Sequence, residues 1–388
     1  MRTRRRWLLP LWAGCCCLLL LAGLGAVVAA AEKIDVFDDL ACHRLEESLN
    51  SSLNFLRTVA PSTRYRIAGR SIPARRLLAS ILHMQRLAAA HPSPEMLAQA
   101  INRAYEIIQI NDPSKSTSKR MSITGYYQPV VSGCLEQQPP CVHPLYRRPK
   151  DLVIRRNKGR KAIVGRLENG TIVPYWTRRE IEQRGLLIGQ ELVWLTDPFD
   201  AFTIHVQGSG IIRLPDGSRR GVHYAAGNGH PYRSIGAFMV KNGRMRLTDI
   251  TMDGLRRSLA ARPEERTRIL HHNDSFIFFD WSEAGPAIGS MGRPLTPGRS
   301  VAADRQWYPP GSLVYIDSRR PVMADNGQVK EWRPMRRLVT VQDTGSAISG
   351  PNRIDIFWGT GDQAGREAGQ MKEDGKAYLL LLKDNFGR

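Results

Sequence analysis

The sequence predicts a mainly β protein with helices (an α+β fold), in which short strands form barrels rather than a doubly wound parallel sheet. After residue 123, short β-rich runs alternate with turns of Gly, Pro, Asn and Asp. Helical patterns are concentrated before residue 110 and return only near residues 178–184 and 231–270. Many strands with few helices between them favour barrels over βαβ units. A chain of 388 residues that is 42% hydrophobic can bury a large core, and its length favours two domains.

The N-terminus has the pattern of an export signal. Four arginines within the first six residues precede an apolar run from Trp7 to Ala31, which ends in three alanines. A basic start, an apolar centre and a small-residue exit are typical of a secretory signal. We therefore predict a signal peptide at residues 1–31, an exported protein and a mature chain that begins near Glu32. The apolar run is 25 residues long, enough to span a bilayer, so an uncleaved membrane anchor is the alternative. Lipidation of Cys15 is disfavoured, because Trp12 stands where a small aliphatic residue is usual.

Three helices are predicted before residue 110. The first lies within residues 32–60, where acidic and apolar residues alternate. The second starts at Ser71-Ile72-Pro73 and runs through Leu82. The third starts at Ser93-Pro94-Glu95 and has apolar residues at helical spacing as far as Ile108. This helical region is expected to be scaffold.

The remaining elements are mostly strands in two blocks. Asp216-Gly217 predicts a tight hairpin turn in the first block. The predicted strands are 152–154, 203–206 and 210–214, followed by 276–279, 313–316, 338–341 and 378–382.

Cysteine spacing predicts one disulfide and gives no sign of a metal site. Three of the six cysteines lie in the predicted signal, which leaves Cys42, Cys134 and Cys141. Cys134 and Cys141 flank six residues and are predicted to close a small loop in an oxidising compartment. Neither CxxC nor HExxH occurs, so no zinc site is expected, and the lack of GxGxxG and GxxxxGK[ST] gives no support for a nucleotide cofactor.

The charge balance suggests an anionic partner. Lys and Arg number 56 against 36 acids, which gives a net charge of +20. A basic, soluble surface without a specific partner is the simpler interpretation. No RNA-recognition signature or zinc finger accompanies the charge, so nucleic acid is not the expected partner.

Three aspartates in the C-terminal block are the best candidates for chemistry. Asp304 precedes a Pro-Pro-Gly turn, Asp343 follows an apolar strand, and Asp355 has apolar neighbours on both sides. Aspartate is disfavoured in strands and rarely buried unless it is paired or functional. Desolvation keeps a carboxylic acid protonated near neutral pH, so that it can donate a proton. An outward-pointing residue in an edge strand is the alternative for Asp355.

Six motif segments run in order from about residue 120 to 365, which is most of the mature chain. They are Thr124-Gly125-Tyr126-Tyr127, Val206-Gln207-Gly208-Ser209-Gly210, the stretch from Tyr224 to Gly236, Arg299 to Arg305, Asp343-Thr344-Gly345-Ser346-Ala347-Ile348 and Asp355-Ile356-Phe357-Trp358-Gly359. Together these segments resemble the family of membrane-bound lytic murein transglycosylase A.

The resemblance implies both an architecture and a reaction. It implies a double-psi β-barrel built from the N- and C-terminal parts of the chain, with a second β-rich, barrel-like domain inserted and the glycan in a groove between them. The implied divisions are a helical region with the first part of the barrel at 32–127, the insert at 128–281 and the three-aspartate domain at 282–388. The implied reaction is cleavage of the β-1,4 bond between N-acetylmuramic acid and N-acetylglucosamine in peptidoglycan, without addition of water, by a periplasmic monomer that needs no cofactor.

The resemblance also implies roles for individual residues. Asp355 is the implied catalytic acid, supported by Asp343 and Asp304. Two departures from the family pattern lie nearby: Ser346 stands in place of a second glycine, and Arg353-Ile354-Asp355 in place of His-Phe-Asp. The expected glycan contacts are Tyr126, Tyr127, Gln207, Gly208, Ser209, Gly210 and Trp358.

Two alternative functions and the role of one basic segment stay open at this point. An inverting hydrolase would use Asp343 as a second carboxylate to activate water. The main non-enzymatic hypothesis is a module that binds the cell wall without cleaving it. The basic run at 147–166 holds nine Lys and Arg and either faces the carboxylates of wall peptides or is a solvated hairpin face.

Overall fold

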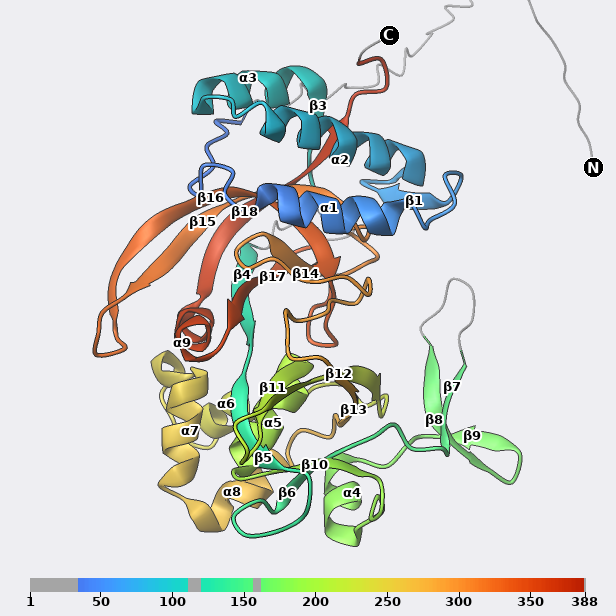
Figure 1. Ribbon diagram of the computed structural model, residues 1–388, viewed down its shortest axis with the longest axis vertical. Helices are drawn as coiled ribbons and strands as arrows, with labels where there is room; N and C mark the ends of the chain where they lie inside the picture. The colour runs from blue at the N-terminus through green and yellow to red at the C-terminus, as the bar shows by residue number, and fades with distance from the viewer. Residues whose placement is uncertain (1–33, 111–119, 156–161, 387–388) are drawn as a thin grey trace, which may run out of the picture. The chain divides into compact units, whose positions relative to one another are not determined.

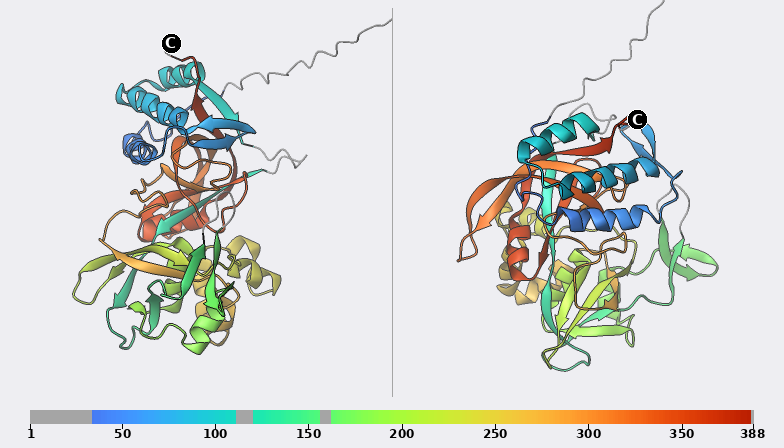
Figure 2. Two further views of the ribbon diagram at one scale, coloured as in Figure 1. Left: turned by 90° about the vertical axis from the view of Figure 1, so that its right-hand side faces the viewer. Right: turned by 45° about the horizontal axis from the view of Figure 1, so that its top comes forward.

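The N-terminal helices form where apolar residues recur at helical spacing. In the computed structural model, which describes residues 34–110, 120–155 and 162–386, α1 is Leu45–Leu56, α2 is Ala74–Ala89 and α3 is Pro94–Ala104. Ser93 caps α3 by accepting a hydrogen bond from the backbone N–H of Met96. The three helices lie together over one side of the barrel described next (Figures 1 and 2).

Six strands pair into a closed barrel drawn from both ends of the chain. Their order is β15-β16-β14-β17-β4-β18, and β15 also pairs with β18, which closes the ring. Two pairings, β14 with β16 and β17 with β4, are parallel, and the others are antiparallel. The strands are β4 (Met121–Gln128), β14 (Ser300–Ala303), β15 (Leu313–Met323), β16 (Val329–Asp343), β17 (Arg353–Thr360) and β18 (Lys372–Leu382), and β3 (Tyr105–Gln109) extends the sheet beyond β18.

The barrel and the helices share one apolar core. Ile123 of β4, Val301 of β14 and Ile356 of β17 are fully enclosed, and Leu49 of α1 and Ile81 of α2 join them in the same cluster. Burying an aliphatic side chain of this size contributes about 1.5–3 kcal/mol. The apolar face of the helical region is therefore what attaches it to the barrel.

A second sheet of six strands occupies the middle of the chain. Its order is β13-β12-β11-β5-β10-β6, and its edge strands β13 and β6 are in contact, which gives the sheet a barrel-like curl. β5 begins two residues after β4 ends, so β4 leads directly from the barrel into this sheet. The strands are β5 (Val130–Cys134), β6 (His143–Tyr146), β10 (Glu191–Leu195), β11 (Ser209–Arg213), β12 (Arg219–Gly227) and β13 (Ile277–Ser282).

Smaller elements complete the described chain. The predicted Asp216-Gly217 turn joins β11 to β12, and Gly217 has the positive φ of 84° that such a turn requires. Residues 152–155 and 163–166 of the basic run lie on the three-stranded sheet β7-β8-β9, and residues 156–161 of the run are outside the described ranges. These elements are β1 (Arg64–Ile67), β2 (Arg70–Pro73), β7 (Leu152–Arg155), β8 (Ile163–Glu168), β9 (Thr171–Val173), α4 (Arg178–Arg184), α5 (Pro198–Gln207), α6 (Ile235–Lys241), a 3-10 turn (Leu247–Asp249), α7 (Met252–Ala260), α8 (Pro263–Leu270) and α9 (Asp362–Gln370).

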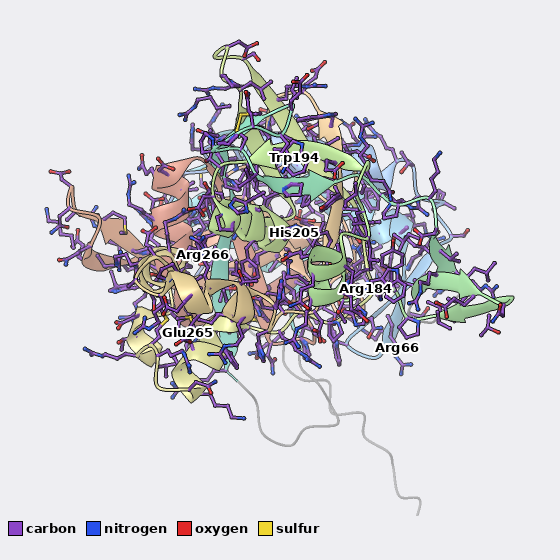
Figure 3. The ribbon with its side chains drawn as sticks, turned by 90° about the horizontal axis from the view of Figure 1, so that it is seen from below. Arg66, Arg184, Trp194, His205, Glu265 and Arg266 are labelled. Carbon is purple, nitrogen blue, oxygen red and sulfur yellow. A yellow bond between two sulfur atoms is a disulfide. The ribbon has the colours of Figure 1, made fainter. Side chains whose placement is uncertain are left out.

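The strand predicted at 203–206 is wrong, because these residues lie in helix α5. Asp197 caps that helix by accepting hydrogen bonds from the N–H groups of Phe199 and Asp200, and Pro198 occupies its first turn. His205, labelled in Figure 3, is buried with its ring 4.3 Å from that of Phe276. Burial holds the pKa of His205 well below its usual range, so the ring is a neutral core residue.

Two predicted helix boundaries are also wrong. Residues 70–73 form β2, so the second helix begins at Ala74 instead of Ser71. The third helix ends at Ala104, and Ile108 belongs to β3. In both places the backbone finds a strand partner, which outweighs the local helical periodicity.

A buried ion pair attaches the N-terminal segment to the barrel. Arg299 is 0% exposed, and its guanidinium donates to both carboxylate oxygens of Asp38 at 2.6 and 2.8 Å. It also donates to the carbonyls of His43 and Leu338 at 2.9 and 2.8 Å. Arg299, the first residue of the matching segment 299–305, is thus a structural residue that joins segments far apart in the sequence.

The predicted signal at residues 1–31 lies outside the described residues. Among the residues that the structure describes, no helix is long and apolar enough to cross a membrane.

Candidate active site

Strand register brings Asp343 and Asp355 together. Short strand β14 lies between β16 and β17, and its Ala302 is the cross-strand partner of both Asp343 and Asp355. Neighbouring strands lie about 4.8 Å apart, so the Cα atoms of the two aspartates lie roughly 10 Å apart across the sheet. The barrel topology therefore places two carboxylates on either side of one small residue.

Asp355 lies in the interior part of β17 and is only 8% exposed. The hydroxyl of Thr124, its cross-strand neighbour on β4, donates to Oδ1 of Asp355. Arg353 precedes Asp355 by two residues, so both side chains leave the same face of the strand. Its guanidinium contacts Oδ1 through Nε at 3.1 Å and Oδ2 through Nη2 at 3.2 Å.

Asp343 ends β16 and is held by three donors. Its Oδ1 accepts from the backbone N–H groups of Ser290 and Thr344 at 2.9 and 2.8 Å. Its Oδ2 accepts from the hydroxyl of Tyr126 at 3.1 Å. Burial raises the pKa of Asp343 above its ordinary value, against the opposing effect of these hydrogen bonds.

Tyr126 links the two aspartates through β4. Its ring packs 5.3 Å from that of Phe357, and its hydroxyl reaches Asp343. Burial, and then the negative charges of Asp343 and Asp355, raise the pKa of Tyr126 well above its usual range. Tyr126 is therefore a neutral hydrogen-bond donor at this site and makes a polar contact to the carboxylate that it was not predicted to make.

The carboxylate of Asp304 forms hydrogen bonds with backbone N–H groups rather than with another side chain. It follows β14, and its carboxylate accepts from the N–H groups of Gln306 and Gly350 at 2.9 and 2.7 Å. Gly350 belongs to the loop between β16 and β17. Asp304 thus fixes the loop that connects the strands of Asp343 and Asp355.

The predicted segment at 207–210 contacts strand β4 through Gln207. Gln207 ends α5, and its side-chain oxygen accepts from the backbone N–H of Tyr127 at 3.1 Å. Gly208 has the left-handed φ of 79° that ends the helix. Ser209 and Gly210 are buried in β11, and a Cβ at Gly210 would lie 2.9 Å from Ile204. The glycine at 210 thus permits close packing of the helix.

The side chains of Tyr127 and Trp358 leave their strands on the face opposite to that of Tyr126 and Asp355. The Tyr127 ring lies against Gly365 of α9, where burial raises its pKa to about 12. Trp358 packs against the barrel core and beside Gly125. The structure does not bring either ring together with Asp343 and Asp355, and glycan contact by these two residues stays a prediction.

The sequence interpretation missed Thr124, Arg353 and Ser290 as parts of the site. Thr124 shares a strand face with Tyr126, two residues away, which is a period that the sequence does contain. The only sequence signal at Arg353 is its departure from the family pattern. Ser290 contributes its backbone N–H, for which no side-chain signal exists.

In the described ranges, no three His, Cys, Asp or Glu side chains are arranged to hold a metal ion.

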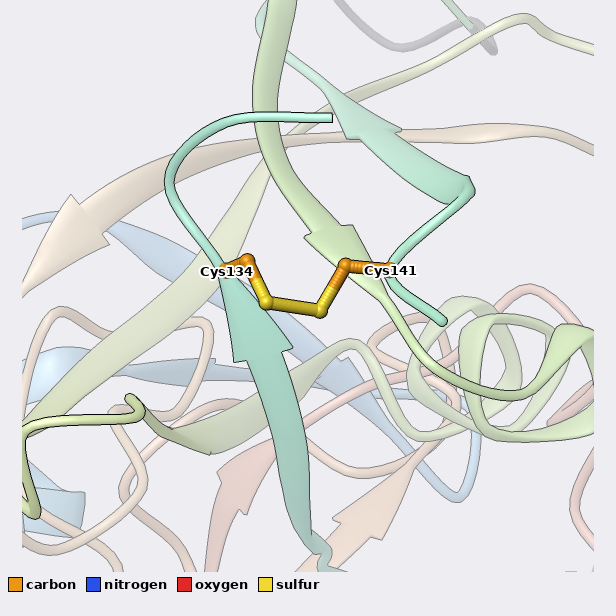
Figure 4. Close-up of a disulfide and its surroundings, with 2 residues drawn as sticks. All are labelled: Cys134 and Cys141. Atoms are coloured by element: carbon orange, nitrogen blue, oxygen red, sulfur yellow. A yellow bond between two sulfur atoms is a disulfide. The ribbon is translucent and has the colours of Figure 1, made fainter. Parts of the chain in front are cut away.

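Cys134 and Cys141 form a disulfide in the structure, with their Cα atoms 5.9 Å apart (Figure 4). This separation lies within the usual range for a disulfide. We expect peptide mapping of the exported protein without reductant to recover the two cysteines in one linked pair of peptides. Cys42, which is free in the structure, is the internal control and should react with a thiol reagent after denaturation. Two alkylated thiols at 134 and 141 in native protein would contradict the prediction.

Comparison with known proteins gives matches along the same segments. A model of the MltA specific insert domain matches residues 122–280, and a model of the 3D domain matches residues 299–381. The membrane-bound lytic murein transglycosylase A of Escherichia coli K12 is 32% identical over 269 residues, which cover 69% of this chain and 67% of that protein. The Vibrio cholerae protein of the same name is 34% identical over 268 residues, or 68% of this chain and 66% of that protein.

Solved structures agree with these sequence matches. A membrane-bound lytic murein transglycosylase from Agrobacterium tumefaciens superimposes with a TM-score of 0.71 at 31% identity, covering 89% of this chain and 93% of that one. Escherichia coli MltA with bound chitohexaose superimposes with a TM-score of 0.68 at 25% identity, covering 91% of this chain and 93% of that one.

Proposed function

The chain belongs to the family of membrane-bound lytic murein transglycosylase A and is a peptidoglycan lytic transglycosylase, and we propose that Asp355 is its single catalytic acid and base. The observation that carries this proposal is the setting of Asp355. It lies within β17 at 8% exposure, and of the three aspartates it is the one whose hydrogen bonds within the described chain all come from side chains rather than from backbone N–H groups.

In the proposed first step, protonated Asp355 gives its proton to the glycosidic oxygen between N-acetylmuramic acid and N-acetylglucosamine. The bond from the anomeric carbon to that oxygen breaks, and positive charge develops on the sugar ring. Asp355 is left as a carboxylate beside that charge. Positioned proton transfer of this kind contributes typically about 10²–10⁴-fold to the rate.

In the proposed second step, the carboxylate of Asp355 takes the proton from the 6-hydroxyl of the muramic acid. The freed oxygen attacks the anomeric carbon and closes the 1,6-anhydro ring. Asp355 is protonated again at the end, so one residue serves both transfers and no water is consumed.

Asp343 is proposed to support Asp355. A water-activating base in an inverting hydrolase needs a carboxylate oxygen that faces water. Both oxygens of Asp343 accept hydrogen bonds from the protein, one of them from two backbone N–H groups. These contacts favour a fixed negative group that orders β4 and the loop before β14 over a base that takes a proton from water.

The proposed partner is the glycan strand of peptidoglycan. Tyr126 contacts Asp343, which supports its proposed part in the site, and glycan contact by Gln207, Gly208, Ser209 and Gly210 stays a prediction. We propose an exported, periplasmic protein, since the signal pattern at residues 1–31 fits this place. Attachment to the membrane through that segment and a monomeric state also stay proposals.

The product ends test this function. Purified enzyme is incubated with peptidoglycan sacculi in water enriched in ¹⁸O, and the released muropeptides are analysed by mass spectrometry. We expect 1,6-anhydromuramic ends without ¹⁸O. Reducing ends that carry ¹⁸O would identify a hydrolase, and binding to sacculi without any release would identify a wall-binding module.

A further inference from the structure

The side chain of Arg353 joins the catalytic aspartate to the loop before it. Besides its two contacts with Asp355, it donates through Nη1 to the carbonyl of Ala347 at 3.1 Å. All three contacts come from one planar guanidinium, so the loop and the carboxylate are held in a fixed relative position. The side chain of Arg353 is about one third exposed, at 37%.

The two oxygens of Asp355 have different surroundings. Oδ1 accepts from both Thr124 and Nε of Arg353, whereas Oδ2 accepts only from Nη2 of Arg353 among the described residues. A protonated carboxyl group has one hydroxyl oxygen and one carbonyl oxygen, and donors are best accepted by the carbonyl oxygen. Two donors on Oδ1 therefore keep the proton off that atom and leave it for Oδ2.

We infer that Arg353 is a positioning residue that, with Thr124, fixes Oδ1 as the permanent acceptor and Oδ2 as the oxygen that exchanges the proton. This inference rests on the proposed function of Asp355 and names the atom and the residues that direct its proton. When Oδ2 carries the proton, its O–H points away from Arg353 toward the glycosidic oxygen and Nη2 donates to a remaining lone pair of Oδ2, so all three contacts of the guanidinium are kept. The proton passes from Oδ2 to the glycosidic oxygen, and the proton of the sugar 6-hydroxyl later returns to Oδ2.

The positive charge of Arg353 also affects the pH range of activity. The charged and titratable groups around Asp355 are Arg353 on its own strand and Tyr126 on β4, with Asp343 behind Tyr126; on the other side β14 presents Ala302. Tyr232 lies close enough to Arg353 for the positive charge of Arg353 to oppose the rise in the pKa of Tyr232 that burial causes. Arg353 is therefore the only cation that contacts the carboxylate within the described chain, and a neighbouring cation favours the ionised form of a carboxyl group.

The test compares Arg353→Gln and Arg353→Lys with the parent enzyme on peptidoglycan. For Arg353→Gln we expect kcat to fall about 10²-fold, as for a misplaced catalytic group, while KM changes little. The alkaline limb of the pH profile of kcat/KM should move to higher pH, because the variant removes the cation that contacts the catalytic carboxylate. Arg353→Lys keeps the charge but loses the forked geometry, so it should keep the pH profile and lose part of kcat.

Arg120→Gln is the matched control. Arg120 forms an exposed ion pair with Asp374, at 2.9 Å, so the variant removes the same charge from the barrel without touching Asp355. It should leave both kcat and the pH profile unchanged. A merely structural role for Arg353 would lower the unfolding temperature without moving the pH profile, and that result would overturn the inference.

Thr124 gives an independent second test. Thr124→Ser keeps the hydroxyl that donates to Oδ1 and should retain most of kcat, whereas Thr124→Val keeps the shape and should lower kcat about tenfold, the effect of one hydrogen bond of roughly 1.4 kcal/mol. Equal activity of these two variants would contradict the assignment of the oxygens. If the parent enzyme itself released no anhydro ends, the proposed function would fail instead, which separates the two failures.

Discussion

Replacing Asp355 by asparagine should abolish the release of anhydro-ended muropeptides. The change keeps the size and shape of the side chain but removes the proton that Asp355 transfers. General acid–base catalysis is worth about 10²–10⁴-fold per transfer, and a residue that handles both transfers should lose at least the upper end of that range. The release of soluble muropeptides from sacculi, quantified by mass spectrometry, is the measurement.

The fold and glycan binding should survive this substitution. An asparagine oxygen can still accept from Thr124 and Arg353 at the position of Oδ1, so the contacts that order β17 are largely kept. Pull-down of the variant with insoluble sacculi and its thermal unfolding curve are the controls. Near-normal release of anhydromuropeptides by Asp355→Asn would show that another residue is the acid.

Asp343→Asn separates the two enzymatic mechanisms. If Asp343 only supports the site, this variant should be impaired but clearly more active than Asp355→Asn, because an amide oxygen can still accept two of its three hydrogen bonds. An inverting hydrolase needs both carboxylates, so in that case the two variants would be equally inactive. The comparison therefore bears on the mechanism and not only on the importance of each residue.

The sequence predicted the barrel strands well where apolar residues are dense. The runs at 313–316, 338–341 and 378–382 all lie in barrel strands, since buried strands read as continuous apolar segments. The run at 203–206 was misread because its β-branched residues resemble a strand, whereas the cap at Asp197 and its packing place it in a helix. Local composition and tertiary context disagree there, and the context decides.

The aspartates were identifiable from sequence, but their partners were not. An aspartate between apolar residues is a local signal. The hydrogen bond from Thr124 to Asp355 joins residues 231 positions apart and depends on the parallel register of β4 and β17. The single alanine that lies between Asp343 and Asp355 likewise follows from the order of β16, β14 and β17. Such contacts depend on the order of the strands in the sheet, and the spacing of apolar residues along the sequence does not reveal that order.

A stability prediction concerns the buried pair of Asp38 and Arg299. Asp38→Asn should lower the free energy of unfolding by about 3–5 kcal/mol, because it leaves the guanidinium of Arg299 buried without a counter-charge. Urea unfolding followed by circular dichroism is the measurement. Asp317→Asn is the matched control, since Asp317 pairs with Arg336 where both side chains are 39% exposed, and such a pair contributes only about 0–1 kcal/mol.

The same pair should make the protein sensitive to acid. Burial alone would raise the pKa of Asp38, but the hydrogen bonds and charge of Arg299 outweigh it and hold that pKa below its ordinary value. A carboxyl group with a lowered pKa in the folded state stabilises the fold above its unfolded pKa of about 3.9, and this contribution is lost as the pH falls through the folded value. The parent protein should therefore lose stability steeply below about pH 4, and Asp38→Asn should lose less over the same range. Parallel curves for the two proteins would show that Asp38 does not carry this dependence. A double variant, Asp38→Leu with Arg299→Met, should recover only part of the lost stability, because it removes the uncompensated charge but leaves the carbonyls of His43 and Leu338 without their donor.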